Sequence, residues 1–280
     1  MRKLRRTPGV LAGAAGIVAA ALAVIGGNEF STTVLVTLGA TFLVYHAATL
    51  SDLRRWWIRH RNSLELTGDY AAGAAAIPWF DRELSPVIPL PILSGWALDP
   101  SAAGFLVRLI KLQSPAVVLE IGSGISTLLM AYALERNGVG KLYSIDAEQA
   151  YASKTTALLQ AHGLSHRAEV IVAPLERLTL SGWGGDWYRI HAFEPIVDAT
   201  VDLLVIDGPP KETAPRARYP AVPMLHAKLK PGATIVLDDA GRPDEKLILQ
   251  SWIEAGFLSR RPEVFPFGSG FAVGTAALTK

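Results

Sequence analysis

The second half of the chain alternates short apolar runs with longer segments in which apolar residues recur at helical spacing. The short runs are rich in Val, Ile and Leu, as strands are, and cover Val117–Ile121, Lys141–Ile145, Ala168–Val172, Val201–Ile206 and Ala233–Leu237. The helical segments cover Ser126–Arg136, Ala147–His162, Pro220–Leu229 and Asp244–Ala255. Strands that alternate with helices build a parallel sheet covered on both faces. The pattern therefore predicts an α/β domain with a Rossmann-like, doubly wound sheet over residues 116–280.

The segments on either side of this pattern predict smaller features. Residues 263–267 and 270–276 favour a final strand hairpin. Ahead of the first strand, Pro100–Leu112 has helical spacing, whereas 62–93 is punctuated by prolines that should break any long helix. We expect residues 62–115 to be a linker with lead-in helices.

Two apolar segments near the N-terminus predict a membrane anchor over residues 1–61. Residues 10–25 and 33–50 each lie at the short end of what crosses a bilayer as a helix. Basic residues flank both, so the positive-inside rule places both flanks in the cytoplasm. We expect a two-helix transmembrane hairpin at the cell membrane, with the α/β domain facing the cytoplasm. A cleaved signal peptide and a pair of soluble core helices are the alternatives.

Composition agrees with an anchor and limits the chemistry of the domain. Half of the residues are hydrophobic, and the mean hydropathy is +0.28. Through Arg61 there are eight basic and two acidic residues, which leaves 19 basic and 23 acidic residues for the remainder. An acidic body argues against nucleic acid as a partner. The absence of cysteine excludes disulfides, zinc–thiolate sites and thiolate nucleophiles.

A glycine turn follows the first predicted strand. Gly122 and Gly124 allow a ligand to approach the backbone closely, next to the positive end of the following helix. Glu120 would repel the pyrophosphate of a dinucleotide but would attract a cationic amino acid. A dinucleotide site would also have a third glycine where Thr127 stands. The turn therefore favours a methyl donor over NAD, with a turn that binds no ligand as the other alternative.

The second predicted strand ends at Asp146. An acid about twenty residues past the glycines hydrogen-bonds ribose hydroxyls in both nucleotide classes. Asp146 thus predicts an adenosine ligand without choosing between the two. It could also cap the helix that begins near Ala147.

These motifs resemble the class I S-adenosylmethionine-dependent methyltransferases, and most of all methyltransferase family 24. The resemblance covers 116–280 and rests on residues 120–128, 205–210 and 237–242, with 96–100 ahead of the first strand. It implies a seven-stranded sheet whose last strand is antiparallel, and S-adenosylmethionine as cofactor. The cofactor-binding residues expected on this basis are Glu120, Gly122, Ser123, Gly124, Ser126, Asp146, Ala147 and Asp207.

Three carboxylates should meet at one edge of the sheet. Asp207 ends the fourth predicted strand, and Asp238 and Asp239 end the fifth. Such a cluster needs charge balance, which a hard cation such as Mg²⁺ could provide. Catechol-type O-methyltransferases hold a metal with a similar set, but with Asn where Asp239 stands. Alternatively, the acids contact the donor, cap turns or pair with Arg242 or Arg216.

The catalytic residues proposed from the sequence are Asp207 and Lys211, with Lys211 as a candidate general base. The aromatic-rich segment 181–191 is either a lid over the acceptor or a set of packing residues. We expect methyl transfer, to a hydroxyl of a small-molecule, glycan or lipid-linked acceptor. The alternatives are a NAD-dependent oxidoreductase and a non-catalytic, membrane-anchored donor-binding domain.

Overall fold

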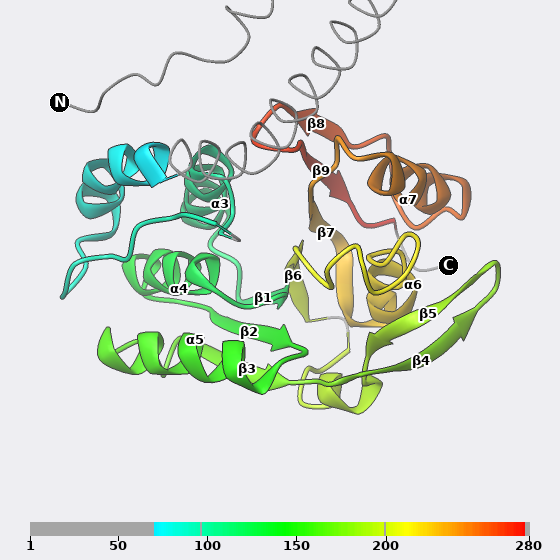
Figure 1. The fold of residues 1–280 in the computed structure, drawn as a ribbon, viewed down its shortest axis with the longest axis horizontal. Coiled ribbons are helices and arrows are strands. Elements are labelled where there is room, and N and C mark those ends of the chain that lie inside the picture. The colour runs from blue at the N-terminus through cyan, green and yellow to red at the C-terminus, as the bar shows by residue number, and fades with distance from the viewer. Residues whose placement is uncertain (1–69, 96, 199, 278–280) are drawn as a thin grey trace, which may run out of the picture. The chain divides into compact units, whose positions relative to one another are not determined.

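The computed structural model describes residues 70–95, 97–198 and 200–277. The chain divides into two units, Met1–Thr67 and Gly68–Lys280, and all described residues belong to the second. This second unit is a sheet with helices packed on both of its faces (Figure 1).

The main sheet has seven strands in the order β3–β2–β1–β6–β7–β9–β8. Their bounds are β1 Val117–Ile121, β2 Lys141–Asp146, β3 Ala168–Val172, β6 Val201–Ile206, β7 Leu229–Asp238, β8 Glu263–Phe265 and β9 Phe271–Thr275. The first five run parallel, whereas β9 is antiparallel to both β7 and β8. The predicted seven-stranded sheet with an antiparallel last strand is therefore confirmed.

Two apolar layers hold the helices on the sheet. On one face lie α3 (Pro100–Gln113), α4 (Ile125–Asn137) and α5 (Gln149–Ala161); on the other lie α6 (Ala221–Leu225) and α7 (Pro243–Glu254) (Figure 1). Alternate residues of each central strand supply both layers: Val118 packs with the first set of helices and Leu119 with the second. A parallel sheet covered in this way needs strands that are apolar on both sides.

Two local features differ from the sequence prediction. Residues 70–84 form a helix that continues through Pro78, although prolines were expected to prevent it. Phe80 and Leu84 of this helix are fully buried, and their packing offsets the backbone hydrogen bond that proline removes. The second feature is an antiparallel hairpin of β4 (Leu175–Leu180) and β5 (Trp183–Tyr188), which forms a separate two-stranded sheet.

The predicted transmembrane hairpin is not supported, and the fold class is corrected accordingly. None of the helices within 70–95, 97–198 and 200–277 is long and apolar enough to span a bilayer. The two apolar segments, 10–25 and 33–50, lie outside the described residues. Segments of 16 and 18 residues are also at the lower limit of what a bilayer core about 30 Å thick requires. The location expected from the hairpin, at the cytoplasmic face of the cell membrane, is untested.

The strand order reverses between β1 and β6, and Gly122 holds the two strand ends together there. The Gly122 amide donates to the Ile145 carbonyl of β2, and the Asp207 amide donates to Ile121. Gly122 has a φ of +97°, and a Cβ at this position would lie 2.6 Å from the Asp207 carbonyl oxygen. The turn can close against β6 only because residue 122 has no side chain.

A buried carboxylate lies directly beneath this turn. Glu120 is fully buried and accepts hydrogen bonds from Ser126 Oγ, Thr127 Oγ1 and Ser144 Oγ at 2.6–2.7 Å. Thr127 Oγ1 in turn accepts from the Gly124 amide at 2.9 Å. Burial raises the pKa of Glu120 to about 7, against the hydroxyl bonds, which lower it. The carboxylate thus connects β1, β2 and the start of α4.

The two glycines of the turn are predicted to tolerate alanine very differently. Gly122→Ala should lower the free energy of unfolding by about 2–4 kcal/mol, because its Cβ meets the Asp207 backbone at an unfavourable φ. Gly124 has an extended backbone with nothing within 4 Å of an added Cβ, so Gly124→Ala should cost about 1 kcal/mol or less. Urea denaturation of both variants measures the difference; equal losses would contradict the proposed contact with Asp207.

Glu120 predicts a pH dependence of stability. Its pKa is raised from 4.5 to about 7 in the folded state, so the folded protein binds the additional proton. This contribution to stability is therefore fully present below pH 4.5 and is lost as the pH rises towards 7. The stability of the wild type relative to Glu120→Gln should fall over this range by up to about 3 kcal/mol. Urea denaturation at several pH values, with Glu148→Gln as an exposed control, tests this; a constant difference would contradict it.

Candidate functional site

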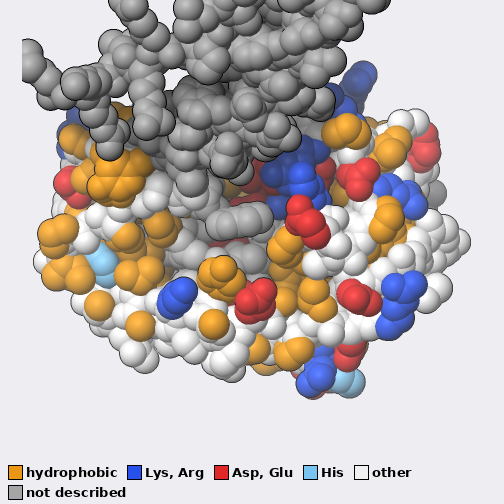
Figure 2. Space-filling model, in the orientation of Figure 1, with side chains coloured by type: hydrophobic (Ala, Val, Ile, Leu, Met, Phe, Trp, Pro, Cys, Tyr) orange, Lys and Arg blue, Asp and Glu red, His pale blue; other side chains and the backbone are white. Residues whose placement is uncertain are grey.

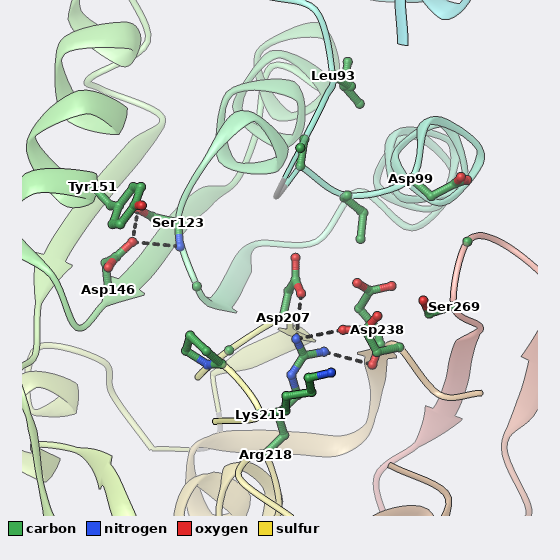
Figure 3. Close-up of a pocket in the computed structure, with 18 of the residues that line it drawn as sticks. Leu93, Asp99, Ser123, Asp146, Tyr151, Asp207, Lys211, Arg218, Asp238 and Ser269 are labelled. Atoms are coloured by element: carbon green, nitrogen blue, oxygen red, sulfur yellow. Dashed lines mark hydrogen bonds and ion pairs between the residues drawn. The ribbon is translucent and has the colours of Figure 1, made fainter. Parts of the chain in front are cut away.

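The candidate site is a cavity of about 810 Å³ at the carboxyl ends of the central strands. Ligands of open α/β sheets bind at this edge, at the point where the strand order reverses. The predicted residues that line it are Gly122, Ser123, Asp146, Ala147, Asp207, Lys211, Asp238 and Asp239. Figure 3 shows Ser123 and Asp146 on one side of the cavity and Asp207, Arg218 and Asp238 on the other.

Asp146 fixes the glycine turn from the end of β2. Its Oδ2 accepts from both the amide and the hydroxyl of Ser123 (Figure 3). Its Oδ1 accepts from the Glu148 amide at 2.9 Å. Asp146 is 8 % exposed, and that exposed part faces the cavity. A carboxylate has about four lone-pair positions, so these three bonds leave room for a ligand hydroxyl. The role of Asp146 in binding ribose stays a prediction.

Three of the predicted cofactor residues do not line the cavity. Glu120 lies beneath the turn, where three hydroxyl groups surround its carboxylate, and Ser126 is one of the donors. Gly124 begins α4 with open space beside its Cα. The structure thus gives Glu120 a positioning role, and its direct contact with a ligand stays a prediction.

The three carboxylates do converge, as the sequence predicted. One oxygen from each of Asp207, Asp238 and Asp239 lies within 4.8 Å of the other two. A buried arginine joins them: Arg218 Nη2 is 3.1 Å from Asp207 Oδ1 and 3.0 Å from Asp239 Oδ2. Its Nη1 donates to the backbone carbonyl of Asp238 at 3.0 Å (Figure 3). Arg242 pairs with Asp239 as well, so the predicted pairing with Arg242 is present.

Burial and mutual repulsion perturb these acids. Burial raises the pKa of Asp207 to about 6, with Arg218 acting in the opposite direction and Asp239 adding to the rise. Burial and the charges of Asp207 and Asp239 raise the pKa of Asp238 to about 8. The cluster therefore shares protons at neutral pH, which suits a site where a proton is to be accepted.

A divalent cation does not fit this arrangement as it stands. Carboxylate oxygens are suitable donors for Mg²⁺, and three lie close together. However, Asp207 and Asp239 each already give an oxygen to Arg218, and Asp239 also pairs with Arg242. Two guanidinium groups supply the balancing charge that a metal would bring. The predicted metal ligands stay untested, and the position of Arg218 argues against them.

Lys211 lies at the rim of the cavity. Its side chain is 60 % exposed, and its ammonium is 4.0 Å from Glu212 Oε1. This position leaves Lys211 free to approach a bound acceptor, although its role as a base stays a prediction.

The aromatic segment 181–191 packs as a core element rather than as a loop. Trp183, Trp187 and Tyr188 belong to β5 and are at most 5 % exposed. Trp183 Nε1 donates to the Pro215 carbonyl at 2.9 Å, which ties the hairpin to the loop after β6. Of the two readings of this segment, packing is the one that the structure favours. Tyr188 nevertheless reaches the cavity wall.

Sequence reasoning missed Arg218 and named Arg216 and Arg242 instead. Arg216 has a φ of +52° and turns away, donating to the Gly182 carbonyl at 2.9 Å. Arg216 and Arg218 are two positions apart in an irregular loop. A loop has no periodicity that would indicate which of the two side chains points inwards. The negative charge of the three converging acids was nevertheless a signal, because it favours a buried cation nearby.

The surface around the site carries both signs of charge. On the face shown in Figure 2, Lys and Arg side chains lie interspersed with Asp and Glu over the half that contains α6 and α7. Hydrophobic side chains gather more densely over the half that contains α3 and α4. Mixed charge of this kind is typical of a solvated protein surface.

Comparison with known proteins adds a family match. Residues 119–240 match the family model described as a methyltransferase domain, methyltransferase family 24. The matched segment runs from β1 to the end of β7 and contains the glycine turn, Asp146 and the three acids. No curated protein matches the chain at a significant level.

Solved structures share the fold at low sequence identity. The SAH-bound methyltransferase PaMTH1 from Podospora anserina has a TM-score of 0.53 at 12 % identity, over 74 % of this chain and 88 % of that one. Cofactor-bound Rv0187 from MTB has a TM-score of 0.50 at 22 % identity, over 79 % and 97 %. The O-methyltransferase from Bacillus cereus in complex with SAH has a TM-score of 0.50 at 17 % identity, over 76 % and 99 %. The family match over residues 119–240 and the strand order agree with a class I S-adenosylmethionine-dependent methyltransferase similar to methyltransferase family 24.

Proposed function

We propose that this methyltransferase transfers the methyl group of S-adenosylmethionine to a hydroxyl oxygen of a small-molecule acceptor. The observation that carries the proposal is that the glycine turn and the carboxylate cluster line one cavity. A donor at the turn would therefore have proton-accepting groups beside it. The sequence also suggested glycan and lipid-linked acceptors, but the hairpin that favoured a lipid is not supported by the structure.

Methyl transfer to oxygen has two requirements. Donor and acceptor must be aligned for an in-line displacement at the sulfonium, and the hydroxyl proton must be removed. In this proposal Ser123, Asp146 and Ala147 hold the donor on one side of the cavity. Asp207 faces the reacting atoms from the end of β6, and Lys211 approaches from the rim. The hydroxyl proton passes to one of these two side chains as the new carbon–oxygen bond forms.

The other functions considered from the sequence are less well supported. A NAD-dependent oxidoreductase is disfavoured by the methyltransferase family match and by Glu120 beneath the turn. A non-catalytic domain would have no need for both an accessible Asp146 and a charge-balanced acid cluster in one cavity. Mg²⁺ is not part of the proposal, because Arg218 already occupies two of the acids. The O-methyltransferase named among the similar structures supports oxygen as the acceptor atom.

The acceptor atom can be tested by transfer of an isotope-labelled methyl group. We expect label in a phenol or alcohol and none in the matched compound with hydrogen in place of the hydroxyl. A methyl ether retains its label in alkali, whereas a methyl ester releases it as methanol. Transfer only to amines or carboxylates would contradict the proposal while leaving the methyltransferase activity intact.

Substitutions at the two predicted catalytic residues should separate binding from turnover. Asp207→Asn and Lys211→Ala should each lower the rate of transfer, by about 100-fold if the residue is the base, because general-base catalysis contributes at least that much. Donor affinity, measured by calorimetry, should change far less than the rate. Glu212→Gln, an exposed acid next to Lys211, is the matched control and should leave both unchanged. Full turnover in both variants with the true acceptor would remove Asp207 and Lys211 from the mechanism.

A further inference from the structure

The acid cluster holds a cation that belongs to the chain itself. Arg218 is 5 % exposed and is the centre of the cluster, with contacts to the side chains of Asp207 and Asp239 and to the backbone of Asp238. A single nitrogen, Nη2, lies 3.0–3.1 Å from two different carboxylates. This nitrogen donates a hydrogen bond to Asp207 and forms an ion pair with Asp239, an arrangement that connects the ends of β6 and β7 (Figure 3).

The surrounding structure holds Arg218 in this position from both sides. The amide of Arg216 donates to Asp244 Oδ2 at 2.8 Å, and the carbonyl of Tyr219 accepts from Trp252 Nε1 at 3.0 Å. Asp244 and Trp252 both belong to α7, and Trp252 is fully buried. The backbone on each side of Arg218 is thus tied to one helix, which limits how far the guanidinium can withdraw from the acids.

Arg218 contacts carboxylate oxygens that would otherwise be available to a metal ion. A metal held by this cluster would need free oxygens on Asp207 and Asp239, and Arg218 takes one from each. Three buried carboxylates this close together are unfavourable unless protons or a cation balance their charge, and Arg218 is a cation in contact with two of them. We propose that Arg218 is the resident cation of the acid cluster in place of a divalent metal, and that it positions Asp207 and Asp239 in the cavity wall. This inference does not depend on which acceptor is methylated.

Two consequences follow for the protein in solution. The wild type has no vacant divalent site at the cluster, so divalent cations and chelators should leave methyl transfer unchanged. Removal of the guanidinium, by contrast, leaves three carboxylates whose oxygens lie within 4.8 Å of one another. That vacated cluster should bind a hard cation, because its donors and charge are those that such an ion prefers.

Titration with Mn²⁺ tests the proposal on the full-length protein without donor or acceptor. Wild type, Arg218→Met, Arg218→Lys and Arg242→Met are compared by electron paramagnetic resonance and by thermal unfolding. Arg218→Met should bind one Mn²⁺ at least tenfold more tightly than wild type. Its lowered Tm should rise by several degrees at about 1 mM Mn²⁺, since a ligand of the folded state stabilises it by mass action. Arg242→Met, which removes a partner of Asp239 but keeps Arg218, should behave as the wild type.

Further variants distinguish metal binding at the cluster from binding elsewhere. Arg218→Met combined with Asp239→Asn should lose the acquired Mn²⁺, whereas Arg218→Lys, which keeps a positive charge, should acquire little. Stoichiometric Mn²⁺ binding by the wild type that Asp207→Asn abolishes would overturn the proposal. So would a folded Arg218→Met protein that binds no Mn²⁺. If Arg218→Met does not fold even with Mn²⁺, the wild-type titration and the effect of chelator on transfer decide the question.

Discussion

The close contact between Gly122 and the Asp207 carbonyl is the constraint on which the site depends. It brings the end of β1 against the end of β6 at the point where the strand order reverses. Two groups of cavity residues lie on either side of this contact. Ser123 and Asp146 lie on the β2 side, and the acid cluster lies on the β6 and β7 side. A side chain at residue 122 would separate the two halves by pushing one strand end from the other.

Buried charge is the second determinant of the architecture, and the chain balances it in two ways. Glu120 accepts hydrogen bonds from three hydroxyl groups and forms no ion pair with a described residue, and burial raises its pKa to about 7, so its neutral form is accessible near neutral pH. Asp207 and Asp239 are balanced by Arg218 instead. The first arrangement secures the turn, and the second connects two neighbouring strand ends. Only the second arrangement lines the cavity, whereas Glu120 lies beneath it.

The sequence predicted the sheet well because its signals are local. Short runs of Val, Ile and Leu indicate buried strands, so β1, β2, β6 and β7 could be predicted from the sequence in their order along the chain. The glycine turn and Asp146 indicate the edge of the sheet at which a ligand binds. What failed depends on tertiary contacts. The helix through Pro78 forms because Phe80 and Leu84 are buried, and the β4–β5 hairpin forms because its tryptophans pack on the sheet. The inward direction of Arg218, and the position of Glu120 beneath the cavity, are likewise fixed by neighbours that lie far away in the sequence.

The shared carbonyl at the switch point also has a consequence for the energetics of binding. Residue 207 provides the backbone oxygen that fits against the donor turn and the side chain that belongs to the acid cluster. A displacement of β6 would therefore alter the geometry of both halves at once. If the donor and the acceptor bind as proposed, their binding would be thermodynamically linked through this one residue, and each ligand would change the affinity for the other by the same factor.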